Sequence, residues 1–156
     1  MAKKHPNDGR REFTPEVYRA AAEERLDTLE FLFMNGFYSV GLYTAGVAVE
    51  SIFRAYRCKI DPVFDSRHNL YELSKAARFS AIVSSALIDG YDRALLDIAT
   101  RWSNNHRYRS DAAMRGFLRR MHLNRGVKGD FLKYNARSAI DAAFVIVHIG
   151  LKKWQN

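Results

Sequence analysis

The stretch YSVGLYTAGVAVESIFRAY, residues 38–56, contains no proline and repeats its apolar residues at helical spacing. Its small residues lie inside the apolar pattern, where each glycine costs roughly 1 kcal/mol of helix propensity. They are Gly41, Ala45, Gly46 and Ala48. We expect the close approach of a neighbouring helix to compensate for this cost. The stretch therefore predicts a long helix, from about residue 37 to residue 58, that packs tightly against its neighbours.

The rest of the chain follows the same helical period. No run alternates convincingly between apolar and polar residues, so no Asn-Gly or Asp-Gly pair joins two strand patterns as in a hairpin turn, and no proline lies beyond Pro62. Further helices are expected at about residues 15–34, 70–78, 85–101, 110–124 and 131–154. Thr14, Ser110 and Asp130 suit the N-cap positions of three of them. The fold class predicted is all-α, an antiparallel helical bundle of about five to six helices.

Length and composition favour a single folded domain. The chain has 156 residues, of which 47% are hydrophobic and 27% charged. We expect a flexible polar tail over residues 1–12 and one helical domain over residues 13–156. The single cysteine, Cys58, excludes an internal disulfide and suits the cytoplasm. The most apolar run, residues 142–151, is too short to span a bilayer, so no membrane association is expected.

Positive charge is concentrated in residues 101–137. This segment holds ten Lys or Arg and two Asp or Glu, a balance of +8 that equals the net charge of the whole chain. The remainder is therefore neutral. A charge imbalance confined to one segment indicates a local binding surface. Aromatic residues lie among the bases, a combination that suits single-stranded RNA, although a solvated helical face or core positions also explain it.

Three polar residues outside this segment are expected to be structural. Glu50 lies within the apolar length of the 37–58 helix and should be a partnered acid. His68 should fix the loop that precedes a short helix. His148 lies in an apolar helix and is expected to be a hydrogen-bonded core histidine.

Arg101 and His106 are the candidate catalytic residues. Metal-free cleavage of RNA needs a base, an acid and a cation that stabilises the charge developing on the phosphate. Histidine titrates near neutral pH, and arginine binds phosphate oxygens in a bidentate way. Five positions do not align two side chains on an ideal helix, but the polar run at 103–109 is expected to break it. The spacing alone is weak evidence in a chain this rich in arginine.

Candidate RNA or phosphate contacts follow from the charge and the aromatic residues of the same segment. They are Asn105, Arg107, Tyr108, Arg109, Arg115, Arg119 and Arg120. His122 is a further candidate, although a solvated position is the simpler expectation. The sequence holds no metal-ligand cluster and no glycine-rich phosphate loop, so neither a metal nor a cofactor is expected.

Three segments, in order, resemble the HEPN-domain family of helical-bundle proteins. Residues 38–56 resemble the small-residue-rich signature helix of the family, and His68-Asn-Leu-Tyr-Glu-Leu73 resembles the segment after its long loop. Arg101-Trp-Ser-Asn-Asn-His106 fits the Arg-x4-6-His pattern of the family. The resemblance covers roughly residues 15–150.

This resemblance implies a homodimer in which the Arg and His of both subunits meet in a basic cleft. It implies a metal-independent endoribonuclease acting on single-stranded RNA, as in toxin–antitoxin or phage-defence systems, and leaving a 2′,3′-cyclic phosphate. Arg101 would then stabilise the scissile phosphate, and His106 would act as base or acid. An antitoxin or a nucleotidyltransferase is the kind of partner protein implied.

Trp102 leaves a second interpretation open. Active members of the family place a polar residue directly after the arginine, whereas this chain has a tryptophan. Other members lack the catalytic pair and carry an aromatic-spacer-Arg-Tyr segment, which Trp102 and Arg107-Tyr108 resemble. The alternative function is a catalytically inactive HEPN dimer that binds RNA, a nucleotide or a partner protein.

Overall fold

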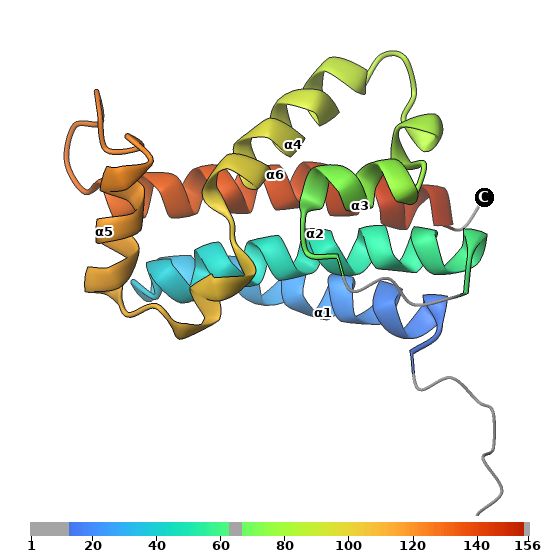
Figure 1. Ribbon diagram of the computed structural model, residues 1–156, viewed down its shortest axis with the longest axis horizontal. Helices are drawn as coiled ribbons and strands as arrows, with labels where there is room; N and C mark the ends of the chain where they lie inside the picture. The colour runs from blue at the N-terminus through green and yellow to red at the C-terminus, as the bar shows by residue number, and fades with distance from the viewer. Residues whose placement is uncertain (1–12, 63–66, 155–156) are drawn as a thin grey trace, which may run out of the picture.

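The computed structural model describes residues 13–62 and 67–154. The regular secondary structure in these ranges is entirely helical (Figure 1). Two short 3₁₀ helices, η1 (Phe79–Ile82) and η2 (Asn104–Tyr108), lie in the connections between α-helices. The described α-helices are α1 (Pro15–Met34), α2 (Tyr38–Ile60), α3 (Leu70–Ala76), α4 (Ile88–Arg101), α5 (Asp111–Arg120) and α6 (Phe131–Trp154). The predicted all-helical bundle is confirmed. The tail expected over residues 1–12 lies outside the described residues.

The predicted N-caps are confirmed at three helix starts. Thr14, Ser110 and Asp130 each accept a hydrogen bond from a backbone N–H in the first turn of the helix that follows. Asn69 caps α3 in the same way. A cap interaction involves residues only a few positions apart, which is why the sequence alone located these boundaries.

Close packing explains the small residues of α2. A side chain at Gly46 would overlap the indole ring of Trp102, which follows α4. On α6, a side chain at Gly150 would overlap Ile52 of α2. Gly41 lies opposite Ile140, whose Cδ1 would be 3.4 Å from an added Cβ. The expected close approach is therefore present, and it brings α2 into the core between α1 and α6.

The helices run in both directions along the bundle. In Figure 1 the colours show α1 running antiparallel to α2, and α4 running antiparallel to α6. α2 and α6 run in the same direction, because the intervening chain returns through α4. α5 lies across the end of the bundle at which α2 and α6 begin (Figure 1). The end at which α1 begins and α6 finishes is the opposite one.

A cluster around the buried Glu50–Arg54 ion pair ties the loop after α2 to that helix. The Oε1 atom of Glu50 accepts hydrogen bonds from Arg54 Nη2 at 2.8 Å and lies 2.7 Å from His68 Nδ1. Arg54 also donates to the backbone carbonyl of Arg67. The structural roles predicted for Glu50 and His68 are therefore confirmed. The cluster fixes the start of α3 against α2.

One polar prediction is wrong. His148 is exposed on α6 and packs beside Phe144, with 5.4 Å between the ring centroids. The buried positions of α6 around it are Ile146, Val147 and Gly150. The sequence prediction failed because most residues around His148 are apolar. α6 nevertheless has one stripe that faces solvent, and His148 lies on it. None of the described helices is both long and apolar enough to cross a bilayer.

Candidate nucleic-acid interface

The basic segment occupies one end of the bundle. It begins at the last residue of α4, continues through η2, α5 and the loop 121–130, and finishes in the first two turns of α6 (Figure 1). The chain turns before and after α5, which lies across the end of the bundle, and this brings bases distant in sequence onto the same end of the molecule (Figure 1). The predicted local concentration of charge is thus also a concentration in space.

Most of these bases have no acidic partner among the residues that the structure describes. Arg101 pairs with Asp97, Arg115 with Asp130, and Arg137 with Glu30 and Asp141. The other seven form no ion pair with any carboxylate of residues 13–62 and 67–154, and all but Arg109 are exposed. They are Arg107, Arg109, Arg119, Arg120, Arg125, Lys128 and Lys133. A surface of unpaired cations attracts polyanions.

His106 lies inside the protein. It is 3% exposed, and its ring packs edge-on against Phe117 at 4.6 Å between centroids. Arg109 Nε–H donates to His106 Nδ1 at 3.1 Å, so the ring proton must be on Nε2. Nε2–H donates in turn to the carbonyl of Arg101 at 2.8 Å. Both ring nitrogens are therefore engaged, and the imidazole is neutral.

Burial lowers the pKa of His106 below its ordinary value of 6.5. The hydrogen bond to the Arg101 carbonyl opposes this shift, and the neighbouring Arg109 charge adds to it. In this arrangement His106 holds the last carbonyl of α4 and the chain that follows it. The structure brings His106 to the backbone of Arg101 rather than to its guanidinium.

Trp102 is a core residue. It is 7% exposed, its ring fills the space left by Gly46, and its Nε1–H donates to the Tyr43 carbonyl at 3.1 Å. The indole thus binds the end of α4 to the middle of α2. This packing accounts for an aromatic residue where the resemblance led us to expect a polar one.

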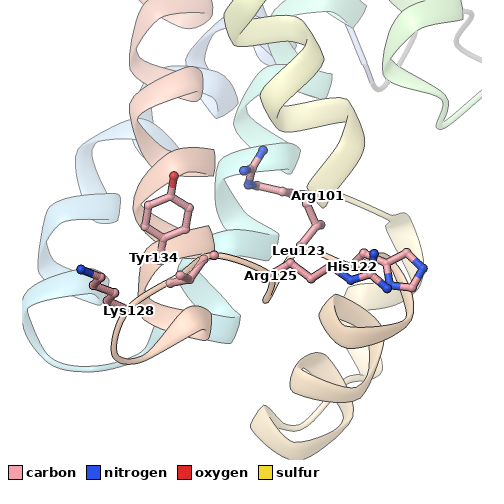
Figure 2. Close-up of a pocket in the computed structure, with 8 residues that line it drawn as sticks. Arg101, His122, Leu123, Arg125, Lys128 and Tyr134 are labelled. Carbon is pink, nitrogen blue, oxygen red and sulfur yellow. The ribbon is translucent and has the colours of Figure 1, made fainter.

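Arg101 faces a cavity of about 480 Å³ between the end of α4, the loop 122–128 and the start of α6. The lining residues are Arg101, His122, Leu123, Arg125, Gly126, Val127, Lys128 and Tyr134. In the view of Figure 2, Lys128 and Tyr134 lie on one side of the labelled group and His122 lies on the other, with Arg101 between them. His106 is not among them. The cavity therefore has a basic lining that includes one aromatic side chain.

The loop of this cavity begins with a helix C-cap. The backbone N–H groups of His122 and Leu123 donate to the carbonyls of Arg119 and Leu118, a Schellman arrangement that ends α5. His122 occupies its left-handed position, with φ of 59°, where glycine is the usual residue. Its side chain is exposed and lines the cavity.

The other predicted contacts fall into two groups. Asn105, Arg107, Tyr108, Arg119 and Arg120 are exposed, and Tyr108 is 77% exposed beneath the Arg107 guanidinium. Arg109 and Arg115 are partly exposed, and each is engaged with other side chains of the protein. Arg109 binds His106 and lies over the Phe117 ring, whereas Arg115 forms a bidentate pair with Asp130.

Asn135 was missed by the sequence analysis. It is fully buried, and its Oδ1 accepts a hydrogen bond from Arg101 Nε at 2.9 Å. Its Nδ2 donates to the carbonyls of Leu123 and Phe131 at 2.9 and 2.7 Å. A lone asparagine in a helical pattern gives no signal of such a role, since its partners come from three separate segments.

No group of three or more potential metal-ligating side chains occurs in the described part of the chain. No protein-family model, no curated protein and no solved structure matches this chain. The functional argument therefore rests on the basic end of the bundle itself.

Proposed function

We propose that this protein is a HEPN-like helical bundle that binds single-stranded RNA through its basic end. The single observation that carries the proposal is the set of seven bases without a carboxylate partner, gathered at one end of the described structure. Exposed Tyr108 and half-exposed Tyr134 add aromatic faces on which unpaired bases stack. The choice of RNA over single-stranded DNA follows the HEPN resemblance.

The geometry favours binding without cleavage at Arg101 and His106. A general base needs a free nitrogen within hydrogen-bond reach of the hydroxyl that it deprotonates. Both nitrogens of His106 are already hydrogen-bonded within the protein. The endoribonuclease and the homodimer implied by the resemblance stay predictions. RNA incubated with the protein in EDTA tests the first, since cleavage that is lost in His106→Ala, with the fold retained, would support it.

Binding is tested by reversing charge at the two ends of the bundle. Arg119→Glu/Arg120→Glu changes the basic end, and Lys152→Glu/Lys153→Glu makes the same change of net charge at the end of α6. We expect the first pair to weaken binding of a labelled RNA of about 12 nucleotides by at least roughly tenfold at low salt. The second pair should have a much smaller effect. Equal losses in both would show non-specific attraction and contradict the proposal.

A further inference from the structure

The cavity at the end of α4 has features that the overall charge of the surface does not explain. Arg101 is held by three hydrogen bonds, from Nε to Asn135 and from Nη1 to the carbonyl and carboxylate of Asp97. Its Nη2 forms no hydrogen bond with the described residues, and the side chain is 12% exposed. One edge of the guanidinium is therefore anchored and the other is available to a ligand.

The remaining cations of the cavity come from a loop. Arg125 and Lys128 are exposed and form no ion pair within the described ranges. Asp97 offsets the charge of Arg101, so these two side chains supply the excess positive charge of the cavity. Tyr134 of α6 lines it as well, with half of its surface exposed. A cavity of this size lies within the range of about 300–1,000 Å³ that is typical of ligand sites.

Asn135 connects the two sources of charge. Its amide oxygen holds Arg101 of α4, and its amide nitrogen holds Leu123 at the start of the loop that carries Arg125 and Lys128. The Asn135 amide makes three hydrogen bonds in all, and the residue is fully buried, so water does not compete for these bonds. Ordering charged groups before a ligand arrives lowers the entropy cost of binding.

We propose that this cavity binds a phosphate group, through Arg101, Arg125 and Lys128, and that Asn135 is the positioning residue that preorganises it. This inference rests on the proposed RNA-binding function for its ligand. The phosphate is either an internal phosphodiester of the strand or a terminal phosphate. Direct contact belongs to the three cations, and Asn135 acts only through Arg101 and the loop.

The cavity is first tested with inorganic phosphate, independently of RNA. Phosphate is titrated into the ¹⁵N-labelled full chain at constant ionic strength, with chloride as the reference anion. We expect saturable shifts in the amides of residues 122–128 and in Arg101 Nε–H, which Arg125→Ala/Lys128→Ala abolishes. Lys75→Ala, on α3, is the control and should leave them unchanged. Shifts spread over the whole surface, or none, would overturn the phosphate site.

RNA distinguishes the two sources of phosphate. The affinity of 5′-phosphorylated RNA is compared with that of 5′-hydroxyl RNA of the same sequence. A terminal-phosphate site predicts tighter binding of the phosphorylated strand, and this difference disappears in Arg125→Ala/Lys128→Ala. An internal site predicts equal affinities, each with a salt slope whose magnitude falls by about 0.7 for each phosphate contact removed. If the wild-type protein binds RNA and Arg125→Ala/Lys128→Ala binds it with the same affinity and salt slope, the inference fails and the proposed function stands.

A double-mutant cycle tests the role of Asn135. Asn135→Ala should weaken RNA binding in the wild-type background but have little further effect when Arg125 and Lys128 are already alanine. Equal losses in both backgrounds would show a general structural defect and contradict positioning. Thermal unfolding shows whether each variant folds, and Asn135→Ser replaces Asn135→Ala in the cycle if the alanine variant does not.

Discussion

At the scale of single residues, the Arg101–Trp102–His106 segment is built as a structural unit. Trp102 fills the space opposite Gly46, and His106 joins the Arg101 carbonyl to the Arg109 guanidinium. The Arg101 side chain points instead to the cavity beyond α4. The two residues that the sequence suggested as a catalytic pair thus face different surroundings.

The buried His106 predicts a pH dependence of stability. Because burial lowers its pKa in the folded state, the unfolded chain binds more protons near pH 6.5 and below. The contribution of the neutral, buried imidazole to the free energy of unfolding is therefore fully present above pH 6.5. It is lost as the pH falls from 6.5 toward the lower pKa of the folded state. We expect the free energy of unfolding in urea to decrease between about pH 7 and pH 5.

His106→Gln should be less stable than wild type near pH 7 and should depend less on pH over this range. The control is His148→Gln, which changes an exposed histidine and should keep the wild-type slope. A pH slope for His106→Gln equal to that of wild type would show that His106 does not titrate as its burial indicates.

At the scale of helices, the close contact between α2 and Trp102 is the most demanding in the core. We expect Gly46→Ala to lower the free energy of unfolding by about 1–3 kcal/mol, because the added methyl overlaps the indole. Gly90→Ala is the control. Nothing lies within 4 Å of its added Cβ, so the variant should be unchanged or more stable, by up to about 1 kcal/mol. Chemical denaturation measures both, and a neutral Gly46→Ala would contradict the packing described.

The sequence predicted what depends on local interactions. The starts of α1, α5 and α6 follow from caps within a few residues, and all three predictions are confirmed. α4 begins at Ile88 rather than Ser85, and no side chain caps it. The network of Asn135 and the burial of His106 depend on segments far apart in the chain. The spacing of apolar residues along the chain carries no information on such long-range contacts. For this reason the candidate site was predicted less completely than the fold.

At the scale of the whole molecule, the fold converts a basic segment into a basic end. The turns on either side of α5 place these cations together, and the cavity of Arg101 is lined by the loop 122–128 (Figures 1 and 2). Among the described acids at this end, Asp97 and Asp130 pair with Arg101 and Arg115, and Asp111 accepts a hydrogen bond from Ser39. The excess charge that remains is available to a polyanion.

The central claim is that this end binds RNA through its phosphates, and the salt dependence of RNA affinity tests it most directly. Fluorescence anisotropy of a labelled single-stranded RNA is measured from about 50 to about 200 mM salt. The logarithm of the association constant should fall linearly with the logarithm of the salt concentration, with a slope of about −0.7 for each phosphate neutralised. We expect a slope that corresponds to several neutralised phosphates. No binding at the lowest salt concentration, or an affinity independent of salt, would contradict the account.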